Sequence, residues 1–284
     1  MTPIQSVRIG PEPFIAVDHA GQGDLVVFLH GIGGNKRNWR DNLPLVAERF
    51  LAAAWDGRGW GDSDDYDGPL SFEDMAADLV RVIDHFGAPR AHLVGLSMGV
   101  KVALNFVHLH PSRVASLTLC DGSLRARKAD PASLREFVRL RQQPLLDGKE
   151  PSDIAEPVAR SLVSPAAQPG ALEQLIDSMS RLHKAMYLKA LELAIFAEDA
   201  PGVGEIAVPT LVVVGQDDRL TPVSEAQALV DAIPAARLAV VEHAGHLVNI
   251  EQPVAFNALL LDFLLAQPPI DARADAAGRN RDFS

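Results

Sequence analysis

Apolar residues along this chain occur in short runs that alternate with segments of helical periodicity. Each run spans four to seven residues, which predicts a buried strand. The runs cover residues 25–29, 51–55, 92–96, 114–120, 210–214 and 238–241. Helices are expected to start at Ser71, which precedes Asp74 by three residues, at Thr221 before Pro222, and at Pro253. Because strands that alternate with helices form parallel sheets, the pattern predicts an α/β fold with a mostly parallel, doubly wound sheet.

The pattern changes in the middle of the chain and again at its end. Between residues 123 and 201 no strand run occurs, and Leu172, Leu175 and Met179 repeat at helical spacing. We therefore expect a helical cap at 123–201, inserted into a core formed by residues 1–122 and 202–266. Apolar periodicity ends near residue 267, so we expect residues 267–284 to form a disordered tail.

Composition narrows the class of protein. The formal net charge is −11, whereas proteins that bind nucleic acids usually present a basic surface. The charge therefore argues against non-specific binding of nucleic acids. Cys120 is the single cysteine, so neither an intrachain disulfide nor a cysteine cluster for zinc can form, and the histidines show no metal-ligand spacing. The sequence contains neither a signal-peptide h-region nor a run of about 18 apolar residues. We expect a cytoplasmic protein without membrane or nucleic-acid partners.

The strongest chemical motif is Gly-Leu-Ser-Met-Gly at residues 95–99. It directly follows an apolar run and directly precedes a helical pattern over residues 100–109, which is the context of a nucleophile elbow. Glycines on both sides of the serine permit a sharp turn without Cβ clashes. An ordinary Gly/Ser turn is the alternative, but the agreement of strand, helix and partner motifs favours Ser97 as a nucleophile.

A glycine-rich segment follows the first apolar run. Residues 30–34 read His-Gly-Ile-Gly-Gly, and backbone at such a turn can offer an N–H group to an oxyanion. We expect the backbone N–H groups of Ile32 and Met98 to form an oxyanion hole. An ordinary strand-to-helix turn is the alternative interpretation.

Candidates for the base and the acid follow the later strands. His246 comes after the last run and is the expected general base, with His243 as its rival three residues earlier. Asp218 follows the run at 210–214 and is the favoured acid, whose task is to orient the imidazole. Asp121 follows the run at 114–120 and is the alternative acid.

Together these motifs resemble those of α/β-hydrolases. The resemblance spans about residues 14–265 and includes Asp-Gly-Arg-Gly at 56–59, Gly-Gln-Asp-Asp at 215–218 and Gly-His at 245–246. It implies the chain order nucleophile, acid, base, which is Ser97, Asp218, His246. Within that group the chain looks most like 3-oxoadipate enol-lactonases and related small bacterial carboxylesterases. This resemblance implies a serine hydrolase that cleaves a small ester or lactone through an acyl-enzyme, without a cofactor.

The same residues help to distinguish this chain from other enzymes with the same fold. Dehalogenases and epoxide hydrolases resemble this chain but attack through an aspartate at the elbow, where this chain has Ser97. Carbon–carbon bond hydrolases keep the serine, yet their glycine-proline-glycine turn is replaced here by Gly33-Gly34-Asn35. Carbon–carbon or amide hydrolysis is therefore the alternative to ester cleavage. A ligand receptor that retains the triad is a third possibility.

The start of the expected cap is rich in basic residues. Residues 124–141 contain six basic side chains, at Arg125, Arg127, Lys128, Arg135, Arg139 and Arg141, against Asp130 and Glu136. We favour the solvated side of an amphipathic helix, because Leu134, Phe137 and Val138 supply its apolar face. The alternative is that Arg125 and Arg127 bind a substrate carboxylate at the entrance of the cap.

Overall fold

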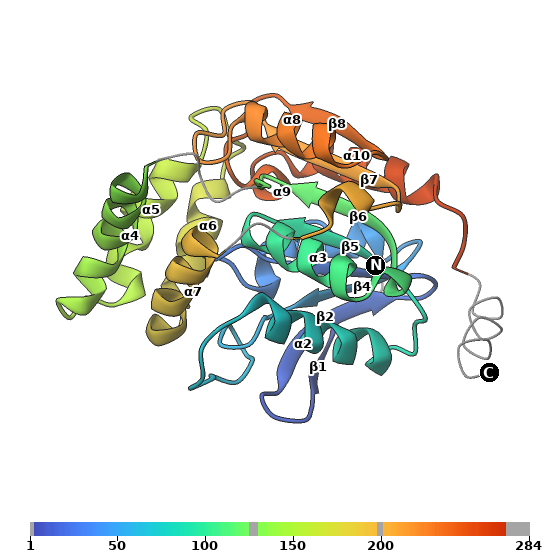
Figure 1. The fold of residues 1–284 in the computed structure, drawn as a ribbon, viewed down its shortest axis with the longest axis horizontal. Coiled ribbons are helices and arrows are strands. Elements are labelled where there is room, and N and C mark those ends of the chain that lie inside the picture. Colours follow the sequence, from blue (N-terminus) through green and yellow to red (C-terminus); the bar gives the residue numbers. More distant parts are fainter. Residues whose placement is uncertain (1–2, 125–129, 198–200, 271–284) are drawn as a thin grey trace.

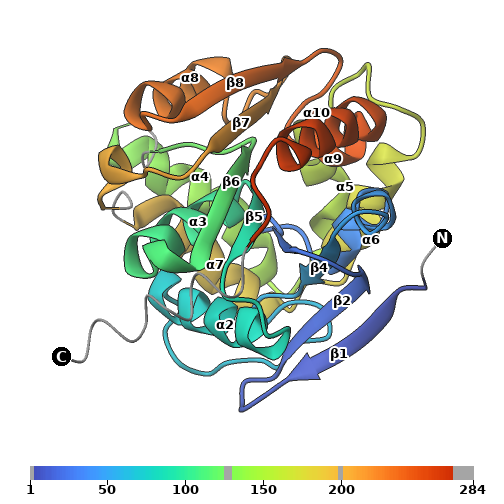
Figure 2. The same ribbon diagram turned by 90° about the vertical axis from the view of Figure 1, so that its right-hand side faces the viewer.

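A single mixed sheet organises the computed structural model, which describes residues 3–124, 130–197 and 201–270. Its eight strands lie in the order β1-β2-β4-β3-β5-β6-β7-β8 (Figure 2). The strands are β1 (Gln5–Ile9), β2 (Ile15–Gly21), β3 (Leu25–Leu29), β4 (Leu51–Trp55), β5 (Ala91–Leu96), β6 (Val114–Cys120), β7 (Thr210–Gly215) and β8 (Ala236–Val241). The β1–β2 and β2–β4 pairs are antiparallel and the other five pairs are parallel, so the predicted fold class is confirmed.

Helices cover both faces of this sheet. In Figure 2, α2, α3 and α8 lie on one face, while α9 and α10 lie on the other; α1 packs against α10 and β4. These helices are α1 (Leu43–Val46), α2 (Phe72–His85), α3 (Met98–Leu109), α8 (Val223–Ala232), α9 (Val248–Glu251) and α10 (Pro253–Leu265). The described residues also contain three 3₁₀ helices, which are η1 (Lys36–Trp39), η2 (Pro111–Arg113) and η3 (Val203–Glu205).

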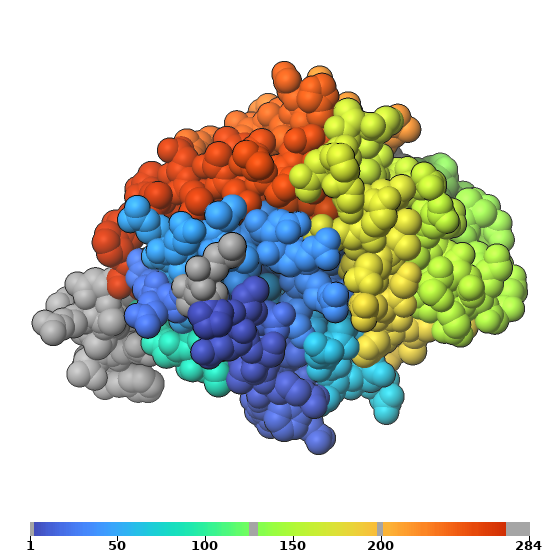
Figure 3. Space-filling view, turned by 180° about the vertical axis from the view of Figure 1, so that it is seen from behind, coloured from blue at the N-terminus to red at the C-terminus, as the bar shows by residue number. Residues whose placement is uncertain are grey.

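Four further helices lie between β6 and β7 along the chain. They are α4 (Pro131–Leu146), α5 (Pro151–Leu162), α6 (Ala171–Ser180) and α7 (Lys184–Phe196), and we call them the helical insertion. Figures 1 and 3 show them together at one end of the molecule, next to the sheet. Among the described helices, none has both the length and the apolar character needed to cross a membrane.

The register of the central strands determines where the loops meet. Leu29 of β3 pairs with Gly95 of β5, and Leu96 pairs with Cys120 of β6. Because parallel strands end at one edge of a sheet, the loops after β3, β5, β6 and β7 emerge side by side there. This is the edge that a parallel sheet offers for a binding site.

Most predicted elements form, with differences at the ends and at one edge. Ser71 caps α2, since its Oγ accepts a hydrogen bond from the Asp74 N–H at 3.0 Å. The capping residue of α8 is Pro222, one residue after the expected Thr221. β1 and β2 were not predicted. β1 is largely exposed and lacks an apolar run, and the apolar stretch of β2 is only three residues long before Asp18 and His19 interrupt it. Arg125 and Arg127 lie outside the described residues.

Candidate active site

The turn between β5 and α3 holds Ser97 in a strained conformation. Ser97 has φ of 54° and ψ of −112°, which non-glycine residues rarely adopt. A Cβ on Gly95 would lie 2.4 Å from the carbonyl oxygen of Gly99, and a Cβ on Gly99 would lie 2.3 Å from that of Leu29. Gly95 is therefore required where β5 meets the start of α3, and Gly99 where α3 packs against β3. Ser97 projects from the end of the sheet.

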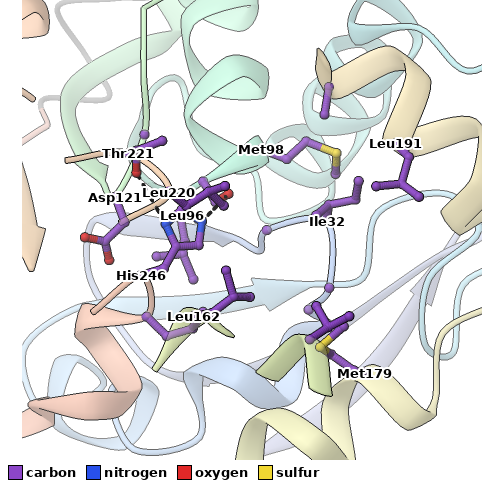
Figure 4. Close-up of a pocket in the computed structure, with 18 of the residues that line it drawn as sticks. Ile32, Leu96, Met98, Asp121, Leu162, Met179, Leu191, Leu220, Thr221 and His246 are labelled. Carbon is purple, nitrogen blue, oxygen red and sulfur yellow. Dashed lines mark hydrogen bonds between the residues drawn. The ribbon is translucent and has the colours of Figure 1, made fainter. Parts of the chain in front are cut away.

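A continuous set of hydrogen bonds joins Ser97 to the ends of β7 and β8. Ser97 Oγ lies 2.9 Å from His246 Nε2, and His246 Nδ1 lies 2.9 Å from Asp218 Oδ2. Thr221 Oγ1 lies 3.3 Å from His246 Nδ1 (Figure 4). The same hydroxyl donates a hydrogen bond to Asp218 Oδ2 at 2.7 Å. The Asp218 carboxylate also accepts backbone N–H groups from Leu220 and Thr221. The structure thus brings Ser97, Asp218 and His246 together, although Ser97 and His246 are 149 positions apart in the sequence.

The two rival candidates from the sequence occupy other places. His243 is exposed, has φ of 60°, and its carbonyl accepts a hydrogen bond from the Gln252 side chain. Asp121 is buried, and its two carboxylate oxygens accept the N–H groups of Gly215 and Val248 at 2.9 and 2.8 Å. Asp121 therefore ties the ends of β6 and β7 to α9, while Asp218 is the carboxylate hydrogen-bonded to His246.

Charges around His246 favour its protonated form. Burial lowers the pKa of His246, but the charge and hydrogen bond of Asp218, with the charges of Asp121 and Glu251, outweigh burial and leave the pKa raised. Burial alone would raise the pKa of Asp218; its contacts with His246 and Thr221 bring that pKa below the ordinary value. Burial, and then the charge of Asp218, raise the pKa of Asp121 to about 8.

Ile32 and Met98 lie at the opening next to Ser97. Met98 is the first residue of α3, so its N–H has no partner within the helix. The Ile32 carbonyl oxygen accepts a hydrogen bond from Trp60 Nε1 at 3.0 Å, which fixes the adjoining peptide. Both side chains line the cavity in front of Ser97 (Figure 4), and a Cβ on Gly31 would lie 3.1 Å from that of Ser97.

A mostly apolar cavity opens above Ser97 between the sheet edge and the helical insertion. The insertion contributes most of its apolar wall through Phe137, Val158, Leu162, Leu175, Met179, Tyr187, Leu191, Ala194 and Ile195. Charged lining side chains in the described part of the chain are Lys101, Arg141 and Asp121. Lys101 Nζ donates to the Ala194 carbonyl at 2.8 Å, and the Arg141 guanidinium carbon lies 3.6 Å from the centre of the Phe137 ring.

Several residues of this region were not found from the sequence. Thr221 was identified only as a helix start, and Glu251 was not singled out, because nothing in the linear pattern links either residue to His246. Arg141 was counted in the solvated helix face, whereas its side chain lines the cavity. Within the described ranges, no group of three or more His, Cys, Asp or Glu side chains could hold a metal ion.

Comparison with known proteins places this geometry in context. A family model described as "alpha/beta hydrolase fold" matches residues 24–253. A 2-hydroxy-6-oxo-6-phenylhexa-2,4-dienoate hydrolase from Burkholderia cepacia is 32% identical over 265 residues, covering 88% of this chain and 91% of that protein. 3-Oxoadipate enol-lactonase 2 from Acinetobacter baylyi is 26% identical over 250 residues, covering 86% and 91%. The malate-bound structure of a thermophilic esterase from Thermogutta terrifontis superposes with a TM-score of 0.83 at 29% identity, covering 92% of this chain and 98% of that one.

Proposed function

The chain belongs to the α/β-hydrolase fold family and is a hydrolase, and from that premise we propose that it cleaves a small carboxylic ester or lactone. The observation that carries this proposal is the unbroken hydrogen-bond path from Ser97 through His246 to Asp218. In this proposal Ser97 is the nucleophile, His246 the general base and Asp218 the acid that orients the imidazole.

The first half of the reaction forms an acyl-enzyme. Ser97 Oγ attacks the carbonyl carbon while its proton passes to His246 Nε2, and the carbonyl π electrons move to oxygen. Asp218 holds the proton on Nδ1 and stabilises the imidazolium. When the tetrahedral intermediate collapses, the bond to the alkoxy oxygen breaks and His246 donates its proton to that oxygen.

The second half repeats these steps with water. His246 Nε2 removes a proton from a water molecule, whose oxygen attacks the acyl carbon and displaces Ser97 Oγ. The Ser97 oxygen recovers the proton from His246, and the carboxylic acid leaves. In this proposal the N–H groups of Ile32 and Met98 receive the negative oxygen in both halves, and one such donor contributes about 3 to 4 kcal/mol to transition-state stabilisation.

The cavity supports a substrate that carries an anionic group. We propose that residues 123–201 form a cap domain on a core of residues 1–122 and 202–266, and that the cap supplies the substrate pocket. Lys101 lies one turn after Ser97 on α3, and Arg141 lines the same cavity from α4. Two cations in a mostly apolar wall suit a substrate with an apolar body and a carboxylate. The esterase neighbour was solved with malate, a dicarboxylate.

A second activity is favoured by one observation. The relative from Burkholderia cepacia, at 32% identity, is named a 2-hydroxy-6-oxo-6-phenylhexa-2,4-dienoate hydrolase. The compound in that name has no ester, lactone or amide bond to hydrolyse, so a carbon–carbon hydrolase is the second candidate. The two activities share Ser97 and differ in the bond that breaks.

A substrate panel separates the candidates. Initial rates are measured for neutral p-nitrophenyl esters, half-esters of dicarboxylic acids, lactones and a 2-hydroxy-6-oxo-dienoate, each with the parent and with Ser97→Ala. We expect turnover of esters or lactones by the parent and none by the variant. Turnover of the dienoate alone would replace ester cleavage with carbon–carbon cleavage, and turnover of nothing would favour the ligand-receptor alternative.

A further inference from the structure

The loop that carries His246 is in main-chain contact with the helical insertion. The His246 N–H donates to the Leu162 carbonyl at the end of α5 at 3.0 Å, and the two side chains lie near each other in Figure 4. A Cβ on Gly245 would lie 2.4 Å from that same oxygen and 2.8 Å from the Ser164 nitrogen. The insertion therefore touches the His246 loop so closely that only glycine fits at position 245.

One buried carboxylate joins the two sides of this contact. Glu251, on α9, has no exposed surface. Its Oε2 accepts the N–H of Ser164 at 2.7 Å and the N–H of Gly245 at 2.8 Å, and its Oε1 accepts the N–H of Leu247 at 2.9 Å. Gly245 and Leu247 are the neighbours of His246 on either side. Glu251 thus holds both of them and the insertion with a single side chain.

Further hydrogen bonds extend the contact toward the acid. Ser164 Oγ donates to Asp217 Oδ2 at 2.6 Å, next to Asp218 in the chain. Gln168 donates its backbone N–H to the Glu251 carbonyl and its side-chain amide to the Ile250 carbonyl. The connection between α5 and α6 is therefore attached to both loops of the proposed triad.

The charge of Glu251 also acts on His246. Burial raises the pKa of Glu251, while the N–H groups of Gly245, Ser164 and Leu247 and the charge of His246 oppose that rise. These three partners are donors, so they suit the carboxylate form of Glu251. In return, the carboxylate adds to the charges that raise the pKa of His246.

We propose that Glu251 is a positioning residue that fixes His246 through both of its neighbours and couples its position to the α5–α6 connection of the insertion. This inference rests on the proposed role of His246 as the base. It implies that the insertion does not lift from the sheet on this side while His246 stays in place. A displacement of about 1 Å at a reacting group can cost about 10²-fold in rate, so such a support matters for turnover.

The first test replaces the carboxylate by its amide. Glu251→Gln keeps the size of the side chain but turns one acceptor into a donor that faces backbone N–H groups. We expect kcat to fall by about 10²-fold and the midpoint of the kcat/KM pH profile to move to lower pH. Glu242→Gln is the matched control, because it removes the same charge from an exposed position four residues before His246. A lower melting temperature with kcat and the pH midpoint unchanged would reduce Glu251 to a purely structural role.

The second test uses the unaltered chain and needs no turnover. Amide hydrogen exchange is followed for Ser164, Gly245 and Leu247, the three donors to Glu251. We expect slow exchange at a common rate, because opening one of these bonds requires opening the contact as a whole. Fast exchange at Ser164 together with slow exchange at Gly245 would overturn the proposed coupling. This test remains valid even if the Glu251→Gln variant does not fold. Absence of hydrolysis by the parent would end the proposed function and leave this result standing.

Discussion

At the scale of single residues, the geometry separates two buried carboxylates that the sequence left in competition. Asp218 contacts the imidazole of His246, while Asp121 accepts two backbone N–H groups at the ends of neighbouring elements. An acid that orients the base and an acid that joins the scaffold respond differently to the same substitution. The two amide variants therefore test the proposed roles.

We expect Asp218→Asn to lower kcat by about 10⁴-fold, because the amide no longer favours the imidazole tautomer that accepts the serine proton. Asp121→Asn leaves a backbone N–H facing an amide group, and we expect it to destabilise the fold by about 1 to 3 kcal/mol with a much smaller loss of kcat. Steady-state kinetics and urea unfolding of both variants measure the two effects. A collapse of kcat in Asp121→Asn alone would show that Asp121, which follows β6, is the acid that orients His246.

The raised pKa of His246 predicts a direction for the pH profile. A general base acts in its neutral form, so kcat/KM should rise with pH as His246 loses its proton. Because nearby carboxylates hold the pKa above the ordinary value of 6.5, the midpoint of that rise should lie above pH 6.5. An ester whose spontaneous hydrolysis is slow across pH 5 to 9 serves as substrate. A midpoint below 6.5 would mean that burial dominates over the carboxylates.

At the scale of elements, the turn between β5 and α3 is the most constrained part of the site. We expect Gly99→Ala to destabilise the fold by about 1 to 3 kcal/mol or more and to abolish hydrolysis, since its Cβ would collide with the backbone of β3. Gly204→Ala is the matched control, because the nearest heavy atom to its Cβ lies 3.9 Å away. Thermal unfolding and ester hydrolysis are compared for both. Near-native activity in Gly99→Ala would contradict the described elbow geometry.

Much of this fold can be predicted from the sequence because its central strands and the elbow have strong local patterns. The apolar runs of β3 to β7 are almost entirely buried, so their composition marks them as strands. The elbow glycines could be predicted because they lie between a strand run and a helical pattern. β1 escaped prediction because an edge strand needs no apolar run. Thr221 escaped prediction because its contact with His246 spans 25 positions. Glu251 escaped because its bond to Ser164 spans 87 positions and its bonds to Gly245 and Leu247 depend on the folded loop, which no local pattern encodes.

At the scale of the whole molecule, a chain with a net charge of −11 lines its main apolar cavity with Lys101 and Arg141. Two arginines of the basic segment at residues 124–141 have different surroundings. Arg139 is exposed and paired with Glu136, while Arg141 reaches the cavity. The two arginines are on the same helix and carry the same charge, so they form a matched pair for a test of substrate charge.

We expect Arg141→Gln to raise KM by about tenfold for half-esters of dicarboxylic acids and to change it little for neutral esters of equal size, because a charge-assisted contact is lost only with the anion. Arg139→Gln should leave both values unchanged. KM is measured for each pair of substrates with both variants. Equal changes for anionic and neutral esters would show that Arg141 shapes the cavity without selecting charge.

In the proposed reaction the Ser97 oxygen attacks the substrate carbonyl and becomes acylated. The most direct measurement is mass spectrometry of the intact and digested chain after reaction with a fluorophosphonate, which traps an activated serine covalently. We expect one adduct per chain, on the peptide that contains Ser97, with labelling lost in Ser97→Ala and greatly slowed in Asp218→Asn. An adduct on another residue, or equal labelling of Ser97→Ala, would show that Ser97 is not the nucleophile.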